Sequence, residues 1–391
     1  MQKDFYYSFM YFIYFLALSL HWSYRNVFLK EFGISNLQLG SILMLLSIVV
    51  LFSQIIWGIV ADNFGRKKIL LIQLLSLMIF LFLFGTSPSV TFAVVFLYLM
   101  SFFAGNIVSV MDSITLSYLE SKRNRYGKIR VFGSIGWAIG NGIAALLVFK
   151  VGMKFLMASS AFFLVPVLIS YMKIKDDAVE KSINKQKRKS KNTLLPVLKN
   201  RGFLFLLITN VIVFTGFQSV VIFMPVYISD VLNMKWLVGI SLFVAGLFEI
   251  IGMRNEEALS KKIGRTVVIG IGFSAMTAKI LLISFAKDIW GVLLAQTLEM
   301  FVWGMFYPAS VIMIGNLVSA EVLSTAQSLF ASSFTVISVI IGSFLGGLIA
   351  DYLGMVWMFR IMSLISLTGV VIFFAFKNRY LPPDFPKEMN Q

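Results

Sequence analysis

The sequence contains no cysteine and a single histidine. The absence of cysteine excludes disulfides and thiolate metal sites, and it leaves the redox compartment undetermined. A polytopic membrane enzyme would need a Ser-His, metal-binding or paired-aspartate arrangement within its apolar runs, and the sequence offers none of these. A sensor would need an output module, and the polar segment after Arg379 is too short for one. We therefore expect no enzyme, no metal and no cofactor.

Charged residues are also scarce. They make up 13% of the chain, and hydrophobic residues make up 59%, whereas a soluble domain has about 25% charged and about 45–50% apolar residues. This composition indicates a polytopic membrane protein. The net charge of +16 does not indicate a nucleic-acid partner, because Lys and Arg lie in short loops between apolar runs rather than on one amphipathic face. No small-residue cleavage site follows the first apolar run, so we expect a retained helix rather than a signal peptide.

Twelve apolar runs are long enough to span a bilayer, which takes about 20 residues for a core of about 30 Å. They predict an all-α membrane protein with twelve transmembrane helices in two six-helix bundles. The runs are roughly 5–29, 37–60, 69–86, 90–118, 130–149, 153–172, 203–230, 236–256, 266–285, 289–317, 323–350 and 355–377.

Basic residues cluster after the even-numbered runs. These residues are Arg66, Lys67, Lys68, Lys122, Arg123, Arg125, Lys128, Lys261, Lys262, Arg265, Lys377 and Arg379. By the positive-inside rule, the even loops and both termini are then cytoplasmic, in an inner or plasma membrane. A long basic stretch divides the chain, so we predict an N-terminal bundle at 1–175, a basic cytoplasmic linker at 176–200, a C-terminal bundle at 201–380 and a cytoplasmic tail at 381–391.

The two halves share a hairpin. Residues 62–66 and 261–265 each end on a glycine followed by a basic residue, which is the weak internal symmetry expected of a transporter built from two bundles. Gly65 permits a tight turn, Asp62 is placed to cap a helix or pair with cations of a neighbouring loop, and Arg66 is placed to anchor the next helix at anionic lipid. A purely topological role, with basic anchors and a turn, is the alternative.

The segment GIVADNFGRKK at residues 58–68 resembles the signature loop between helices 2 and 3 of the major facilitator superfamily. GGLIADYLG at residues 346–354 resembles the matching loop late in the second half. The resemblance covers essentially the whole chain. It implies two bundles that rock about a central cavity and give alternating access, with Gly58, Asp62, Gly65 and Arg66 in a gating loop.

Two charges lie in adjacent apolar runs. Asp112 precedes the basic turn near residues 121–126 by about three helical turns, and Arg130 follows it by one to two, so the two can lie near the same depth. Each buried charge costs about 2.5–3.5 kcal/mol unless it meets a partner or a polar ligand. Trp137 lies two turns beyond Arg130, on nearly the same side. A structural Asp112–Arg130 ion pair and an interfacial Trp137 are the alternatives.

The spacing from Asp112 through Tyr126-Gly127, Arg130, Phe132-Gly133 and Gly136-Trp137 resembles the lactose permease branch of this superfamily, which also includes nucleoside and phenylpropionate permeases. The resemblance implies that Asp112 and Arg130 hydrogen-bond the substrate and that Trp137 stacks on it. In the second half, Glu249 and Lys279 fall where that branch has a Glu and an Arg, and Glu299 falls in its helix 10 run, where the best-known proton carrier of the branch is missing.

Glu249, Lys279 and Glu299 are two acids and one base within apolar runs. One carboxylate is thus left without a cation, and burial favours its protonated form, so it is a natural proton carrier. Glu299 or Glu249 is the candidate, with Lys279 as modulator. The alternative is a satisfied Glu249–Lys279 pair, with Glu299 hydrogen-bonded to a neighbour such as Gln296 or Tyr307.

His21 and Arg25 lie four residues apart in the first run. A cavity-facing cation there would favour an anionic solute; the alternative is that Arg25 reaches the outer interface and His21 is a packing residue. We expect a proton-coupled symporter of a small polar organic solute, a sugar or glycoside, acting as a monomer in the lipid bilayer without nucleic acid. An efflux antiporter or a facilitator for an organic anion, nucleoside or drug-like solute is the alternative, although the fifth run lacks the Gly-Pro pair of drug antiporters.

Overall fold

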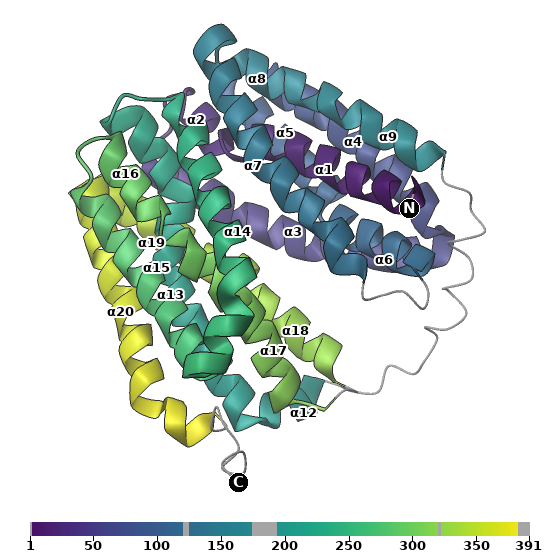
Figure 1. Cartoon of the computed structure of the whole chain (residues 1–391). Coiled ribbons are helices and arrows are strands. Elements are labelled where there is room, and N and C mark those ends of the chain that lie inside the picture. Colours follow the sequence, from purple (N-terminus) through teal and green to yellow (C-terminus); the bar gives the residue numbers. More distant parts are fainter. Residues whose placement is uncertain (1, 120–124, 174–193, 320–321, 382–391) are drawn as a thin grey trace. The chain divides into compact units, whose positions relative to one another are not determined.

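The computed structural model describes residues 2–119, 125–173, 194–319 and 322–381, and within these ranges every regular element is helical (Figure 1). The first part of the chain contains α1 (Gln2–Trp22), α2 (Arg25–Lys30), α3 (Asn36–Phe64), α4 (Arg66–Gly85), α5 (Val90–Ala104), α6 (Ile107–Leu119), α7 (Tyr126–Val151), α8 (Met153–Ser160), η2 (Ala161–Leu164) and α9 (Val165–Met172). The second part contains α12 (Leu194–Lys199), α13 (Arg201–Val226), η3 (Tyr227–Val231), α14 (Leu237–Ile263), α15 (Arg265–Phe285), α16 (Ile289–Gln296), η4 (Met300–Phe306), α17 (Tyr307–Leu317), α18 (Leu323–Ser332), η5 (Ser333–Ile337), α19 (Ser338–Leu353) and α20 (Met355–Tyr380). The predicted all-α class is confirmed.

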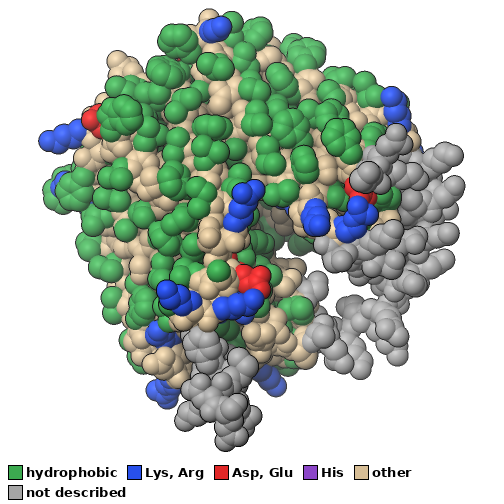
Figure 2. All heavy atoms as spheres, in the orientation of Figure 1, with side chains coloured by type: hydrophobic (Ala, Val, Ile, Leu, Met, Phe, Trp, Pro, Cys, Tyr) green, Lys and Arg blue, Asp and Glu red, His purple; other side chains and the backbone are tan. Residues whose placement is uncertain are grey.

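Eleven helical spans among the described residues are long and apolar enough to cross a membrane. The twelfth predicted span corresponds to α1 and α2. The 21 residues of α1 have a length of about 30 Å, but four tyrosines and one histidine lower its mean hydropathy below that of the other spans. Large apolar side chains cover most of the helical surface visible in Figure 2, as lipid-facing helices require. The twelve-helix count is consistent with the structure.

The helices form two compact units. Unit 1 comprises Met1–Ile34, Leu45–Lys189 and Asn233–Phe243, and unit 2 comprises Ser35–Met44, Ser190–Leu232 and Val244–Gln391. Compared with the predicted halves, the first turns of α3 group with unit 2 and the first turns of α14 group with unit 1. Most of the predicted linker and tail lies outside the described residues.

Within unit 1, α1 and α7 approach each other through small residues. A Cβ atom at Gly136 would lie 2.1 Å from the carbonyl oxygen of Phe12, and one at Gly140 would lie 2.0 Å from Ser19 Oγ. No side chain larger than a hydrogen atom fits at that distance, so these glycines allow the two backbones to come close. These glycines therefore allow α7 to pack directly against α1, and the packing determines which side chains lie between the two helices.

Within unit 2, the first amides of α3 are capped by the carboxylate of Asp351, at the end of α19. The backbone N–H groups of Asn36 and Leu37 each donate to Asp351, at 2.8 Å. A carboxylate at a helix N-terminus satisfies unpaired amides and the helix dipole together. Asp351 lies in the segment that resembles the second signature loop, and here it acts as a cap.

Unit 2 contains the π-helical segments η3, η4 and η5, which interrupt otherwise continuous apolar runs. η4 ends just before Pro308, whose ring nitrogen cannot donate to the carbonyl of Gly304. Because π-helical turns are frequent at functional sites, η4 draws attention to the residues beside it.

Candidate substrate and coupling sites

Six side chains lie in a row where α1 packs against α7. Within each helix, the second residue follows the first by four positions and the third follows the second by seven. This spacing places the three residues of each helix on one face. The residues are Tyr11, Phe15 and Trp22 of α1 and Tyr126, Arg130 and Trp137 of α7. Tyr11 is buried and the other five are half-buried. With Asp112 of α6, we call this set the α1–α7 seam.

The Asp112 carboxylate is held by a phenol group. The Tyr11 hydroxyl donates to Asp112 Oδ1 at 2.6 Å, and Tyr126 is close enough to interact with the carboxylate electrostatically. Neutral donors of this kind stabilise a carboxylate in an apolar bundle without neutralising its charge. A carboxylate has about four acceptor sites and Tyr11 uses one of them, so acceptors remain for a ligand.

The Arg130 guanidinium stacks on aromatic rings. Its Cζ lies 4.3 Å from the centroid of the Phe15 ring and 5.5 Å from that of Tyr11. Gly133 leaves room for it, because a Cβ there would lie 2.6 Å from Arg130 Nη1. Tyr11 contacts both Arg130 and Asp112, so one side chain links the two charged groups. Among the described residues they form no ion pair with each other, and the in-plane N–H donors of Arg130 are directed to no carboxylate.

The seam continues to a pair of tryptophans. The ring centroids of Trp22 and Trp137 are 5.3 Å apart in an edge-to-face arrangement. Arg25, the first residue of α2, has its Cζ 5.9 Å from the Trp22 centroid, and its Nε donates to Asn26 Oδ1 at 3.3 Å. Asn141 Nδ2 donates to the Trp137 carbonyl at 2.9 Å. Trp137 thus lies beside the Trp22 ring and the Asn141 amide.

His21 is buried, with 4% of its surface exposed, and its Nδ1 lies 3.4 Å from the carbonyl oxygen of Ala17 in its own helix. A turn at Ser23 and Tyr24 separates α1 from α2, so His21 and Arg25 belong to different helices. This environment suits a packing residue more than a ligand.

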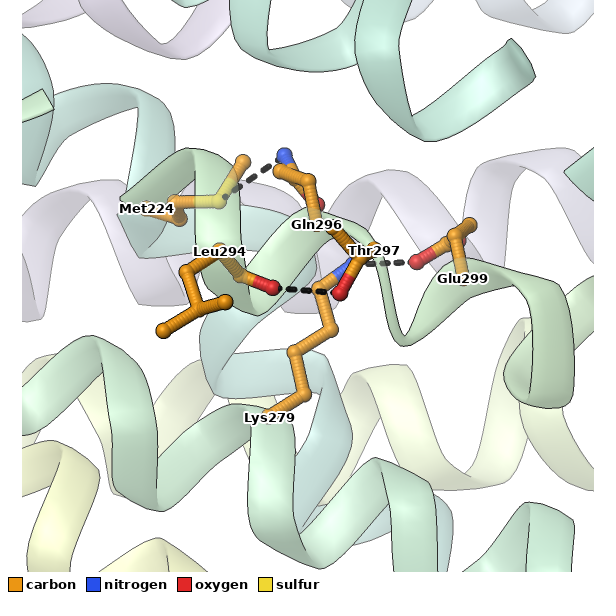
Figure 3. Close-up of polar contacts among 6 residues, drawn as sticks. All are labelled: Met224, Lys279, Leu294, Gln296, Thr297 and Glu299. Carbon is orange, nitrogen blue, oxygen red and sulfur yellow. Dashed lines mark hydrogen bonds and ion pairs between the residues drawn. The ribbon is translucent and has the colours of Figure 1, made fainter. Parts of the chain in front are cut away.

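In unit 2, Lys279 of α15 and Glu299 form a buried ion pair (Figure 3). The exposed fractions of the two residues are 3% and 7%. Lys279 Nζ also lies 5.8 Å from the centroid of the Phe217 ring. Lys279 therefore pairs with Glu299, the acid that the alternative prediction left to a neutral neighbour. A buried pair of this kind is expensive to break on one side only.

The helix that carries Glu299 is interrupted at this pair. α16 ends at Gln296, a turn covers Thr297 and Leu298, and η4 follows Glu299 directly. Gln296 is fully buried; its Nε2 lies 3.4 Å from Met224 Sδ, and its Oε1 has no hydrogen-bond partner among the described residues (Figure 3). The predicted span over 289–317 matches a candidate membrane span of the structure, and its regular α-helical turns are interrupted where the charge lies.

Glu249 is half-buried on α14. A Cβ on Gly304 of η4 would lie 2.7 Å from the Glu249 carbonyl oxygen, so α14 and η4 are in close contact at this level. Glu249 therefore lies on a helix that touches the segment following Glu299. No group of three or more His, Asp or Glu residues able to hold a metal occurs in the described ranges.

The predicted gating loop forms a tight helix-to-helix turn in unit 1. Gly65, between α3 and α4, has a φ of +94°, and Gly264, between α14 and α15, has a φ of +92°. Side-chain-bearing residues rarely adopt this conformation, so the repeated glycine follows from the turn. Arg66 is buried at 7% exposure. The Asp62 side chain lies outside the described residues.

The turn at Gly264 is surrounded by charged side-chain contacts. Ser260 Oγ donates to Glu256 Oε1 at 2.6 Å, and Arg265 Nε lies 3.7 Å from the same oxygen. Lys261, at the position equivalent to Asp62, instead pairs with Glu257 at 2.7 Å. The two hairpins therefore share a backbone turn but not a charge pattern.

Gly65→Ala is expected to lower the free energy of unfolding by about 1–3 kcal/mol because of the positive φ. Gly58→Ala is the matched control. Its Cβ would approach nothing closer than Asn106 Nδ2 at 4.0 Å, and alanine in a helix interior stabilises by about 0.5–1 kcal/mol over glycine. Thermal unfolding of both variants in detergent measures the difference. A Gly65→Ala variant as stable as Gly58→Ala would contradict the account of the turn.

Sequence reasoning missed Tyr11, Phe15 and Trp22. The signal was present, because their spacing repeats that of Tyr126, Arg130 and Trp137 in a parallel partner helix. It also missed the turn at residues 297–298, because no proline or glycine in this run marks a helix end there.

Comparison with known proteins adds the family. A family model described as the MFS_1 like family matches residues 5–361. The uncharacterized transporter YwbF of Bacillus subtilis (strain 168) is 23% identical over 344 residues, which cover 87% of this chain and 84% of that protein. The maltose permease of Geobacillus stearothermophilus is 32% identical over 132 residues, 33% of each chain.

A solved structure of the nucleoside transporter NupG has a TM-score of 0.82 at 15% identity, and the match covers 97% of this chain and 99% of that one. At this identity the likeness shows the fold. The family match extends across nearly the whole chain and agrees with the membrane-spanning helices and the signature loop. The chain therefore belongs to the MFS_1-like family of major facilitator superfamily transporters.

Proposed function

We propose that this transporter is a proton-coupled symporter that imports a small polar organic solute, a sugar or glycoside, by alternating access. The observation that carries the proposal is the α1–α7 seam. Asp112 supplies acceptors, Arg130 supplies planar donors, and Trp137 supplies an apolar face. A sugar has hydroxyl groups around its rim and a less polar ring face, so it matches this combination.

The maltose permease that matches a third of this chain is, by its name, a sugar permease, which supports the same substrate class. Both termini are assigned to the cytoplasm by the positive-inside rule. A monomer is sufficient, because the seam and the Lys279–Glu299 pair each lie within one chain.

Proton coupling rests on the Lys279–Glu299 pair. A proton that binds Glu299 removes its charge and leaves Lys279 as a buried cation without a counter-ion. Such a state is costly, so protonation would favour a rearrangement of the helices that carry the pair. The gating loop around Gly65 would then limit how the helices of unit 1 move.

A nucleoside is the second candidate substrate. The observation in its favour is the Trp22–Trp137 pair, whose two aromatic rings lie beside each other at 5.3 Å. A planar base can stack on a tryptophan more extensively than a sugar can. The ribose hydroxyls would then meet the Asp112 and Arg130 end of the seam.

A stability screen of the purified protein distinguishes these substrates. Maltose, lactose, uridine and phenylpropionate would each be added at one acidic and one neutral pH. We expect a sugar to raise the unfolding temperature, and Trp137→Ala to lose that rise. Trp290→Ala is the matched control, because Trp290 is 73% exposed on α16. Stabilisation by uridine alone would favour the nucleoside, and stabilisation by none of the four would contradict the proposed substrate classes.

A further inference from the structure

The first turns of α20 carry one charge within a lipid-exposed stripe. Exposed apolar residues recur every three or four positions along this face: Trp357 at 55%, Leu364 at 62%, Leu367 at 44% and Val371 at 59%. Arg360 occupies the position between Trp357 and Leu364, on the same face. It is also the only charged residue of α20 before Lys377. An arginine at such a position needs an explanation.

The Arg360 guanidinium is held between two aromatic rings. Its Cζ lies 4.9 Å from the centroid of the Trp357 ring and 5.1 Å from that of Phe285, the last residue of α15. Phe285 is 59% exposed. The rings come from different helices, so they fix the position of the cation rather than follow its motion.

This cation has no counter-ion in the described part of the chain. Arg360 Nε is buried and has no hydrogen-bond partner there, and no carboxylate pairs with the guanidinium among the described residues. By contrast, Arg125 contacts Asp4, and Arg265 lies near Glu256. The geometry therefore presents an oriented, unneutralised guanidinium to the surroundings of the helices.

The site lies at one end of the membrane-spanning helices. α15 ends at Phe285 and α20 begins at Met355, so Arg360 is about 7.5 Å along the helix from its first residue. Helical side chains tilt toward the N-terminus, which brings the guanidinium closer to that end. Gly354 precedes the helix and has no side chain to cap the first amides, which leaves further donors at the same end.

We propose that Arg360, clamped by Trp357 and Phe285, binds the phosphodiester group of an anionic phospholipid. A guanidinium and a phosphate form two parallel charge-assisted hydrogen bonds. The acyl chains of the same lipid would lie along the stripe formed by Leu364, Leu367 and Val371. Tryptophan at the headgroup level is the usual aromatic anchor of a membrane helix. On the orientation proposed above, the lipid belongs to the outer leaflet, although the site does not depend on that assignment.

The alternative occupant is water, with Arg360 merely extending to the interface. That role needs a freely extending side chain, whereas the two rings here fix the guanidinium beside an apolar stripe. A lipid supplies both the anion and the apolar chains that this surface matches. Measured lipid affinity therefore distinguishes a bound lipid from water at this site.

Native mass spectrometry of the purified full-length chain tests the proposal. Delipidated protein would be titrated with phosphatidylglycerol and, separately, with phosphatidylcholine carrying the same acyl chains. We expect the wild type to bind at least one phosphatidylglycerol more tightly than phosphatidylcholine. We expect Arg360→Gln to lose that lipid, with an affinity lower by about tenfold or more, as for other charge-assisted hydrogen bonds.

Two further variants sharpen the test. Arg125→Gln is the matched control, because Arg125 already forms an ion pair with Asp4. This variant should bind the lipid as the wild type does. Phe285→Leu keeps the cation and removes one ring, so we expect a smaller loss; it also serves if Arg360→Gln does not fold. Equal phosphatidylglycerol affinity in wild type and Arg360→Gln, or equal affinity of the wild type for both lipids, would overturn the proposal.

Discussion

Arg130→Lys and Asp112→Asn should each weaken solute binding by about 10- to 100-fold while the protein remains folded. A hydrogen bond to a charged group contributes about 1.5–3 kcal/mol, and the proposed binding mode loses at least one such bond in each variant. Lysine keeps the charge of Arg130 but loses the planar fork and the stacking on Phe15. Asparagine keeps an acceptor for the Tyr11 hydroxyl, but it loses the charge and replaces one acceptor oxygen with an N–H donor.

The chain provides matched controls for both changes. Asp4 accepts a hydrogen bond from the Tyr118 hydroxyl at 2.8 Å and contacts Arg125, so it repeats the chemistry of Asp112 and Tyr11 about two helical turns before Tyr11. Asp4→Asn and Arg125→Lys should therefore leave affinity unchanged. Binding of the solute found in the stability screen would be measured by calorimetry for all four variants. Unchanged affinity in Asp112→Asn or Arg130→Lys would remove that residue from the substrate site.

A structural role for Arg130 would give a different pattern. If its stacking on Phe15 only holds α1 against α7, Arg130→Lys should lower the unfolding temperature, at a cost of about 0.5–2 kcal/mol, and leave affinity intact. The two readouts thus separate binding from packing.

The fold and family were predictable because their signals are local in the sequence. Apolar runs, basic loops and the segment around Gly65 each depend on residues next to one another, and a bilayer selects for them directly. The prediction that Asp112 and Arg130 lie near the same depth came from their distances to a shared turn. The partners of these charges did not follow, because spacing along a helix fixes depth but not which neighbouring ring or hydroxyl is reached.

The second bundle was harder to predict for the same reason. Three charges on three helices allowed two pairings for Lys279, and only the rotations of the helices decide between Glu249 and Glu299. The break beside Glu299 was also hidden. The turn at Thr297 and Leu298 lies between Gln296 and Glu299, and polar residues such as these also occur within intact helices, so the sequence marked no boundary there.

Glu299→Gln is expected to stop accumulation driven by a pH gradient and to permit exchange of preloaded solute. Glutamine imitates the protonated carboxyl group, so the proton can no longer be taken up and released. Exchange needs only the movement between the two access states, which does not require proton release. Accumulation and counterflow in proteoliposomes measure the two activities separately.

The control comes from a second ion pair, and the fallback variant comes from the Lys279–Glu299 pair itself. Glu257 pairs with Lys261 on the exposed face of α14, so Glu257→Gln changes the same chemistry where no coupling is proposed and should accumulate normally. Glu299→Gln leaves Lys279 buried without a partner, which can cost about 3–5 kcal/mol. The double variant Lys279→Gln with Glu299→Gln removes that charge and keeps the test valid if the single variant is unstable.

The double variant also decides between coupling and structure. If the pair only holds α15 to the helix that carries Glu299, replacing both partners by neutral residues should restore stability and leave accumulation at the wild-type level. If Glu299 carries the proton, accumulation stays lost however stable the protein becomes. Accumulation that survives in the double variant would move the carrier role to Glu249, and its further loss in Glu249→Gln would establish that assignment.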